Sequence, residues 1–317
     1  VVRPASTEEV SKVVRLAGSF QVNIVPVGGN TGLNGGTHSD DAISISMERM
    51  NKICEIRLNS KIAIVEAGVI LSNLHQLVNE NDLMFPLTFG ARGSATMGGV
   101  LSTNAGGSNV LKYGNTRDLV LGVEIVLPSG KIMNLMSELH KDNSGYCLRD
   151  LVIGAEGTLG VITKAVVKLF PKPRAYATAM IAVESLDSAL ALLNELQEGT
   201  GGAVAAYEYM PKRYIQGHMQ LSSFSKKPFK KDYEHLIMVE LETTIELFSR
   251  YGDDGKVLLS GELERILNKN LNKGFILDAH IAQNEEQRLI MWERRESAAE
   301  ISLLKTPLIN NDIAVPL

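Results

Sequence analysis

Several features that mark other protein classes are scarce in this 317-residue chain. Its only two cysteines, Cys54 and Cys147, lie far apart, which suits a reducing compartment better than a disulfide-stapled scaffold. No stretch approaches 18 uninterrupted apolar residues, so we predict no membrane-spanning helix. Lysine and arginine number 32 against 36 aspartate and glutamate residues. This balance excludes the strong basic field that nucleic acid or anionic lipid would require, and we expect no nucleic-acid partner.

The common nucleotide-binding and catalytic motifs are also missing. The dinucleotide-binding pattern G-x-G-x-x-G does not occur. The Gly-Lys pairs at Gly130 and Gly255 are followed by isoleucine and valine, which excludes a phosphate-binding P-loop. There is no HExxH or Cys-x-x-Cys motif, so no zinc site is recognisable, and no G-x-S-x-G nucleophile motif. At 44% hydrophobic and 21% charged residues, the composition is nevertheless that of a globular protein.

The chain divides into two unlike halves. Twenty of its 28 glycines fall within the first 160 residues. Two prolines in Pro171-Lys172-Pro173 would interrupt any helix or central strand, and they mark the seam. We therefore predict one domain over residues 1–170 and a second over residues 171–317. The chain opens on Val1 without an initiator methionine, and we expect it to be a piece of a longer protein.

The pattern in both halves predicts an α+β fold, since the helices are mixed with strands that pair as hairpins. Ser6 and Glu9 form a capping-box pattern ahead of an apolar helical stripe that ends at Ala17. The other helices expected are 71–80, 186–197, 261–270 and 284–304. The strands expected are 24–27, 42–46, 53–58, 62–67, 119–127, 131–135, 160–170, 177–183, 204–209, 235–241 and 308–315. The stretch 222–231 is polar, basic and typical of a loop.

The most informative segment is Pro26–Gly36, which places five glycines within nine positions after a β-run. Each glycine costs more backbone entropy on folding than another residue would, so such a run needs a compensating use. One use is a nest of backbone N–H groups that cradles a diphosphate. The alternative is a glycine-rich hairpin loop, and the segment alone leaves both readings open.

Two further segments favour the cradle. Residues 86–107 combine glycines with small hydroxyl side chains, and Gly154–Ile162 runs from glycines directly into a strand. Three segments in one half that can approach a ligand by backbone indicate one large phosphate-bearing cofactor that lies across all of them.

Together these segments resemble the FAD-binding domain of the vanillyl-alcohol oxidase/p-cresol methylhydroxylase superfamily. The resemblance is to the D-2-hydroxy-acid dehydrogenase branch, which oxidises D-lactate, D-2-hydroxyglutarate or glycolate. It implies a two-subdomain FAD-binding domain of the p-cresol methylhydroxylase type. A substrate or cap domain with a ferredoxin-like antiparallel sheet would follow, truncated at its C-terminus. The residues implied to bind FAD are Pro26, Val27, Gly28, Gly29, Asn30, Thr31, Gly32, Leu33, Pro86, Leu87, Gly90, Ser94, Ala95, Thr96, Gly98, Gly99, Ser102, Thr103, Asn104, Gly107, Gly157, Leu159, Gly160, Val161 and Ile162.

The resemblance also bears on how the flavin is attached. Several relatives link it covalently through a histidine in the pyrophosphate loop, whereas this loop carries Asn30 and Thr31. We therefore expect non-covalent FAD. His38, just beyond the loop, is read as a surface histidine.

In the second half, Trp292–Glu296 is similar to the W-x-x-R-E helix of the family. The resemblance implies that Arg295 clamps the substrate carboxylate, a task suited to a planar bidentate donor. The helix pattern alone favours an exposed arginine paired with a glutamate, and the resemblance reverses that preference. Asn310 stands where the family has a substrate-facing lysine, and Ala314 stands where it has a serine. The chain also stops before the histidine-rich segment that supplies the base and the ligands of a divalent metal in relatives.

The reaction implied is oxidation of a small D-2-hydroxy acid to the 2-oxo acid, with hydride transfer to flavin N5. The electron acceptor would be a quinone, a cytochrome or an electron-transfer flavoprotein, and a homodimer is an open option. We expect a cytoplasmic protein, with peripheral attachment to an inner membrane as the alternative. Two other functions stay open: oxidation of a non-carboxylate alcohol on the same fold, and an FAD-binding subunit without turnover of its own.

Overall fold

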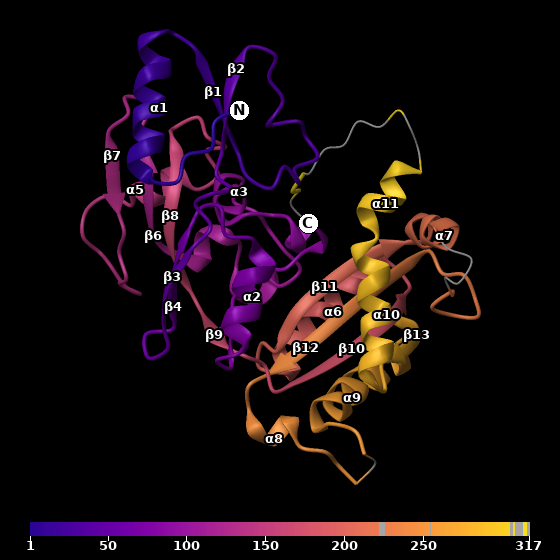
Figure 1. Cartoon of the computed structure of the whole chain (residues 1–317). Coiled ribbons are helices and arrows are strands. Elements are labelled where there is room, and N and C mark those ends of the chain that lie inside the picture. The colour runs from indigo at the N-terminus through magenta and orange to yellow at the C-terminus, as the bar shows by residue number, and fades with distance from the viewer. Residues whose placement is uncertain (222–225, 254, 305–306, 308–312, 316–317) are drawn as a thin grey trace. The chain divides into compact units, whose positions relative to one another are not determined.

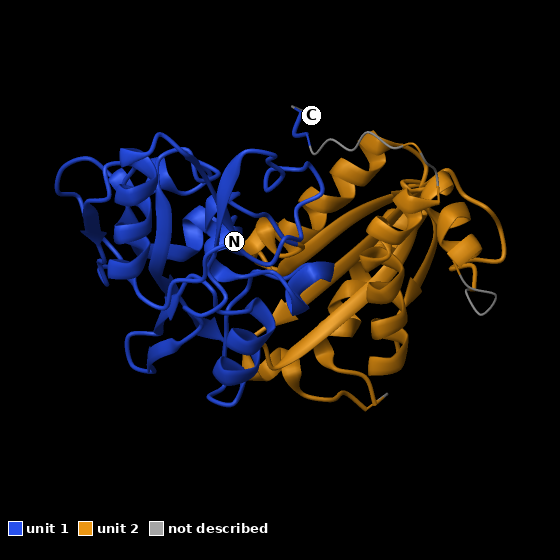
Figure 2. Ribbon diagram, turned by 45° about the horizontal axis from the view of Figure 1, so that its top comes forward, with its two compact units in different colours: residues 1–107, 113–172, 310–317 blue, residues 108–112, 173–309 orange. Residues whose placement is uncertain are grey.

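The computed structural model describes residues 1–221, 226–253, 255–304, 307 and 313–315. The chain forms two compact units (Figure 2). Unit 1 contains Val1–Gly107 and Tyr113–Lys172, together with the described residues beyond 312. Unit 2 contains Ser108–Lys112 and the described residues from 173 to 307. The helices and strands of each unit are labelled in Figure 1.

Unit 1 is built around a five-stranded antiparallel sheet. Its strand order is β3 (Ile53–Arg57), β4 (Ile62–Glu66), β8 (Val161–Lys168), β6 (Val120–Val126) and β7 (Ile132–Leu135). The β6–β7 pair is the predicted hairpin, and its turn places Gly130 at φ 76°. A parallel pair of strands, β1 (Asn23–Val27) and β2 (Ala42–Ser46), lies outside this sheet. Because β1 and β2 run parallel, the glycine segment between them is not a hairpin loop.

The helices of unit 1 begin where local chemistry favours them. Helix α1 (Thr7–Ser19) starts at Ser6, whose hydroxyl accepts a hydrogen bond from the backbone N–H of Glu9 at 3.2 Å. Its apolar stripe packs on the core that contains Ile45 and Met50. The remaining elements of this part of the chain are α2 (Leu71–Asn79), β5 (Leu83–Met84), α3 (Met97–Ser102), α4 (Val110–Tyr113), α5 (Leu148–Val152), β9 (Phe170–Pro171) and the short 3-10 turns Gly90–Gly93 and Thr116–Leu119.

Unit 2 contains a four-stranded antiparallel sheet in the order β11 (Val204–Pro211), β12 (His235–Thr243), β10 (Ala175–Val183) and β13 (Ile276–Ile281). With the intervening helices this is the ferredoxin-like order that was expected. Helices α6 (Leu186–Gly199) and α9 (Leu258–Asn272) cover one face, where alternate residues such as Ile181 and Val239 are buried (Figure 1). Helices α7 (Lys212–Leu221) and α10 (Glu285–Glu296) supply side chains to the core on the other face, which contains Met180 and Met238. Short helices α8 (Glu246–Ser249) and α11 (Ala298–Leu303) complete unit 2.

Two sequence expectations differ from the structure. The single helix expected over 284–304 is divided at Ser297, where α10 ends and α11 begins. The strand expected over 308–315 falls largely outside the described residues, and residues 313–315 are not in a strand.

Candidate functional site

The three glycine-rich segments of unit 1 meet at one cavity of about 750 Å³. They approach it from the end of β1, from the segment around α3 and from the start of β8. The lining residues are Pro26–Asn34, Gly36, Thr37, Met47, Phe89, Ala95, Thr96, Gly98–Val100, Ser102–Gly106, Glu156, Gly157 and Gly160–Ile162. Segments far apart in sequence therefore form a single concave surface of the size that small-molecule and cofactor sites have.

Some of these glycines are needed because one backbone passes against another. A Cβ atom on Gly29 would lie 1.9 Å from the carbonyl oxygen of Ser94, and one on Gly28 would lie 2.3 Å from Thr96 Oγ1. A Cβ on Gly98 would lie 2.8 Å from the Cβ of Ala67. Such distances are far inside van der Waals contact, so only glycine lets the first two segments pack together.

Other groups at the cavity are suited to a ligand. Gly32 has no heavy atom within 4 Å of an added Cβ position, so its backbone faces open space. Thr96 Oγ1 is buried and has no hydrogen-bond partner, an arrangement that is costly unless a ligand supplies one. Among the described residues, no lysine or arginine lines the cavity, and the one carboxylate that does is that of Glu156. A diphosphate in this cavity would therefore be bound by neutral N–H and O–H donors, and the residues fit an FAD in this respect.

Most residues expected to bind FAD line this cavity, and six do not. The six are Pro86, Leu87, Gly90, Ser94, Gly107 and Leu159. Leu87 is instead part of the hydrophobic core, and its carbonyl oxygen lies 2.9 Å from His75 Nε2. Phe89 and Glu156 line the cavity although sequence reasoning did not select them. Both lie inside the motifs that were singled out, so the signal was available.

His38 does not line the cavity. Its side chain is 82% exposed, and its nearest charged neighbour is Asp40, at 3.8 Å. This agrees with the interpretation of His38 as a surface residue. Asn310, the other expected catalytic position, lies outside the described residues.

In unit 2, helix α10 is fixed to the sheet by the buried carboxylate of Glu240 on β12. Glu240 accepts hydrogen bonds from Trp292 Nε1 at 2.7 Å and from Arg288 at 2.7 and 2.9 Å. Thr178 on β10 donates a fourth, at 2.7 Å. The guanidinium of Arg288 also stacks 4.2 Å from the ring centroid of Tyr176. Burial alone would lower the pKa of Arg288, but its bonds to Glu240 outweigh this and raise it.

Arg295 lies on the same helix face, since its spacing from Arg288 and Trp292 is seven and three residues. Its Nε donates to Glu208 Oε2 on β11 at 2.5 Å. The side chain of Arg295 is 32% exposed and that of Glu208 is 17% exposed, so part of the guanidinium remains accessible. Arg295 is thus paired with a glutamate, and that partner comes from the sheet rather than from its own helix.

The neighbouring Arg294 points elsewhere and is only 4% exposed. It donates to the carbonyl oxygen of Lys226 at 2.9 Å, while its Nε has no partner. No ion pair joins it to a carboxylate among the residues described. Burial lowers the pKa of Arg294. Burial and the nearby charge of Arg294 together lower the pKa of His218 on α7. Arg294 is thus a buried structural group, distinct from the accessible Arg295.

Two further features are absent from the described part of the chain. It contains no cluster of three histidine, cysteine, aspartate or glutamate side chains able to hold a metal ion. No described helix combines the length and apolar character needed to cross a membrane.

Two family models together match most of this chain. The family model described as "FAD binding domain" matches residues 1–136, and that described as "FAD linked oxidases, C-terminal domain" matches residues 172–317. The chain belongs to the FAD-linked oxidase superfamily. This confirms the resemblance inferred from the glycine segments and gives FAD as the cofactor of the N-terminal family.

Curated relatives of this chain lie in the D-2-hydroxy-acid branch of the superfamily. The chain is 32% identical to the mitochondrial D-2-hydroxyglutarate dehydrogenase of Arabidopsis thaliana, over 99% of this chain and 55% of the relative. It is also 32% identical to a D-2-hydroxyglutarate dehydrogenase of Xanthomonas citri and to a putative mitochondrial D-lactate dehydrogenase of Schizosaccharomyces pombe. These matches cover 98% and 99% of this chain and 63% and 58% of the relatives. The chain therefore spans little more than half the length of these relatives.

Solved structures confirm the two-domain fold of the FAD-linked oxidase. An alkyldihydroxyacetonephosphate synthase matches with a TM-score of 0.70 at 20% identity, over 95% of this chain and 54% of that one. A p-cresol methylhydroxylase with bound substrate also matches with a TM-score of 0.70, at 16% identity, over 93% and 60% of the two chains. At these identities the likeness concerns the fold alone.

Proposed function

We propose that this chain is the FAD- and substrate-binding part of a dehydrogenase that oxidises a small D-2-hydroxy acid to the 2-oxo acid. D-lactate, D-2-hydroxyglutarate and glycolate are the candidate substrates. The observation that carries the proposal is Arg295, whose side chain is partly exposed and paired with Glu208, in a chain similar to D-2-hydroxyglutarate dehydrogenases.

In this proposal, residues 1–170 bind FAD without a covalent bond, along the cavity of unit 1. Backbone groups of Gly32 and Gly99 approach the ligand closely, and Thr96 Oγ1 gains the hydrogen-bond partner that it lacks. When bound, FAD supplies the acceptor for the hydride that leaves C2 of the hydroxy acid.

Residues 171–317 bind the hydroxy acid, with Arg295 as the carboxylate clamp. Glu208 binds Nε, and the Tyr214 hydroxyl on α7 lies close to the same side chain. In this proposal the terminal nitrogens of Arg295 make the bidentate contact with the substrate carboxylate. Glu208 orients the guanidinium plane, and Glu240 orients the helix that carries it. A carboxylate bound in this way holds C2 of the substrate in place. The chain thereby contributes to the reaction rate by positioning the reacting carbon. Asn310 contributes as a second, neutral contact.

The test uses the full-length protein that contains this chain. Its visible spectrum should show oxidised flavin, and acid precipitation should release the flavin to the supernatant. Anaerobic addition of a D-2-hydroxy acid should bleach the flavin, whereas the L-enantiomer should not. A flavin-loaded protein that no D-2-hydroxy acid bleaches would refute the substrate class. Flavin retained in the pellet would overturn non-covalent attachment alone.

Arg295→Lys and Arg295→Ala separate a carboxylate substrate from a neutral alcohol. Losing a charge-assisted bidentate contact costs roughly 1.5–3 kcal/mol, so we expect KM to rise by about ten- to a hundredfold in Arg295→Ala. Flavin content should not change. If the substrate is a neutral alcohol, KM should move by less than about threefold, and the alternative reaction on the same fold would be favoured.

The electron acceptor remains one of a quinone, a cytochrome or an electron-transfer flavoprotein. Reduced protein mixed with each class in turn identifies it by the acceptor that reoxidises the flavin. A divalent metal, a homodimer and a cytoplasmic or membrane-peripheral location remain predictions from the sequence.

A further inference from the structure

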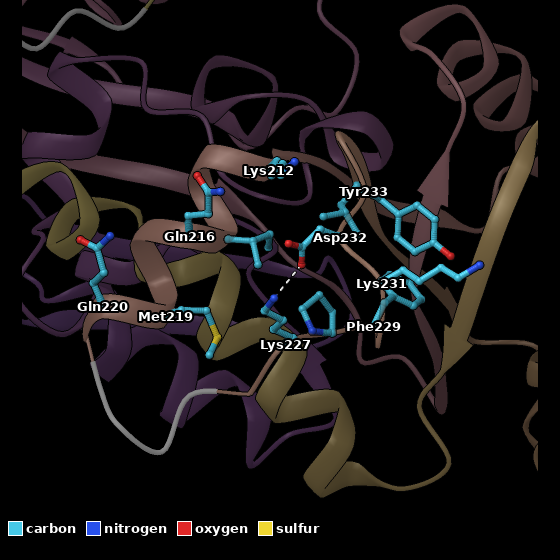
Figure 3. A pocket seen from close by; sticks show the side chains of 12 residues that line it. Lys212, Gln216, Met219, Gln220, Lys227, Phe229, Lys231, Asp232 and Tyr233 are labelled. Carbon is cyan, nitrogen blue, oxygen red and sulfur yellow. Dashed lines mark hydrogen bonds and ion pairs between the residues drawn. The ribbon is translucent and has the colours of Figure 1, made fainter.

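A second cavity, of about 410 Å³, lies entirely within unit 2 (Figure 3). It is lined by Lys212, Ile215, Gln216, Met219 and Gln220 of α7, by 227–229 and 231–233, and by Leu236 at the start of β12. None of the expected FAD-binding residues lines it, nor does Arg295; Asn310 lies outside the described residues. Its volume falls in the lower part of the range for small-molecule sites.

The apolar part of this cavity is recessed. Ile215 and Phe229 are each 8% exposed, and Leu236 is 3% exposed. Phe229 is further fixed by an edge-on contact with Tyr233, with ring centroids 5.5 Å apart. Side chains this deeply buried cannot project into a lipid bilayer, so the surface suits the tail of a small molecule that enters the cavity rather than a membrane.

The rim has an excess of positive charge. Among the described residues, three lysines (Lys212, Lys227 and Lys231) and one carboxylate residue, Asp232, line the cavity. Figure 3 shows Lys227 reaching toward Asp232, and the two form an ion pair at 2.8 Å. Lys212 pairs with Glu234 at 2.8 Å.

Lys231 forms no ion pair with any residue that the structure describes, and it is exposed. The segment 226–234 as a whole holds four lysines and two carboxylates, in a chain whose net charge is −4. Both carboxylates are already paired, so an incoming anion meets a net positive field and an incoming cation is repelled.

We propose that this cavity binds an amphipathic monocarboxylate, with its apolar tail against Ile215, Met219 and Phe229 and its carboxylate among the rim lysines. The apolar wall supplies affinity through buried surface, and the lysines supply the preference for an anion. The site does not depend on the proposed oxidation, because its residues are separate from Arg295 and from the FAD cavity.

Octanoate is the probe, and its binding to the full-length protein is measured by isothermal titration calorimetry below its micellar concentration. We expect one octanoate per chain, with affinity that falls as salt is raised. Octanol and octylammonium should each bind at least about tenfold more weakly. Binding should persist in Arg295→Ala, which shows that octanoate does not simply occupy the hydroxy-acid site. Equal binding of octanol and octanoate would overturn the proposal.

Substitutions then locate the site. The double variant Lys227→Gln/Lys231→Gln should weaken octanoate binding by about tenfold or more, since it removes two ammonium groups from the rim. Lys230→Gln is the matched control, because Lys230 is exposed on the same loop but does not line the cavity. It should change affinity by less than about twofold. Met219→Trp should fill the cavity and abolish binding, and the lysine variants keep the proposal testable if that variant does not fold.

The alternative that these residues bind a lipid surface is tested in parallel with vesicles of phosphatidylcholine and phosphatidylglycerol. If the protein binds these vesicles, loses that binding in the double variant and does not bind octanoate, the cavity residues serve a lipid surface and the proposal is wrong. Flavin content and turnover should be unchanged in both lysine variants. Their loss would indicate that this cavity belongs to the oxidation site.

Discussion

Replacing Glu240 by glutamine should destabilise unit 2, because it removes the charge of a buried carboxylate in its sheet. The side chain is 4% exposed and accepts four hydrogen bonds, two from Arg288 and one each from Trp292 and Thr178. An amide of the same shape offers one acceptor oxygen in place of two and brings an N–H group toward N–H donors. It also leaves the Arg288 guanidinium, 19% exposed, without its buried counter-ion.

The magnitude follows from how buried the pair is. Removing one partner of a buried ion pair costs about 3–5 kcal/mol, and the partial exposure of Arg288 favours the lower end, about 3 kcal/mol. Glu285→Gln is the matched control because Glu285 also pairs with Arg288, at 2.9 Å, but is 65% exposed. An exposed pair of this kind contributes about 0.2–1 kcal/mol.

Urea unfolding followed by tryptophan fluorescence measures this difference directly. The chain has a single tryptophan, Trp292, and its indole N–H bonds to Glu240, so the signal reports on unit 2. We expect the midpoint of Glu240→Gln to fall well below that of Glu285→Gln with an unchanged m-value. Equal losses in the two variants would refute the argument, since it assigns the difference to burial alone.

Three further predictions follow from contacts already described. Arg294→Met should leave the free energy of unfolding within about 1 kcal/mol of the parent or raise it. The reason is that an apolar side chain replaces a buried charge that has no carboxylate partner among the described residues. A loss above about 2 kcal/mol in urea unfolding would contradict this. Gly29→Ala should abolish flavin retention on a desalting column, since its Cβ would meet the Ser94 carbonyl, whereas Gly93→Ala, with no atom within 4 Å, should retain it; retention by both would show that the loop can move apart. Two lysine ammonium groups lower the pKa of the Glu195 carboxyl to about 2, so its stabilising contribution is present above the unfolded pKa near 4.5 and is lost as pH falls toward 2. In Glu195→Gln the free energy of unfolding should therefore depend less on pH in that window. A pH dependence equal to that of the parent would show that the charges are fully screened.

Local chemistry made much of the fold predictable. Helix α1 begins at the serine whose capping pattern predicts it, and the β6–β7 hairpin follows from apolar runs around Pro128–Gly130. Helix α3 was not predicted, because Met97-Gly98-Gly99 has poor helix propensity and is helical only through its packing. Strand β13 was missed as well, because its burial pattern lacks a clean alternation of apolar and polar residues.

The site was predictable to the extent that its residues are contiguous in sequence. The glycine segments could be recognised from composition, and the structure brings them to one cavity. The contacts that fix Arg295 could not, because Glu208 lies 87 residues away and the bonds from α10 to Glu240 span 48 and 52 residues. A glutamate inside the apolar run of β12 indicates a buried partner, but nothing local identifies that partner.

The short segment Ser108–Lys112 gives the two units a shared topology that no single cut can separate. Although it lies within the N-terminal half of the chain, it is part of unit 2, where Lys112 pairs with Glu242 at 3.0 Å. Glu242 is 2% exposed and is synthesised 130 residues later. During translation Lys112 therefore gains its carboxylate partner only after β12 has been synthesised. A fragment that starts at Pro173 would lack the lysine, so expression of unit 2 alone calls for residues 108–112 to be supplied as a separate peptide.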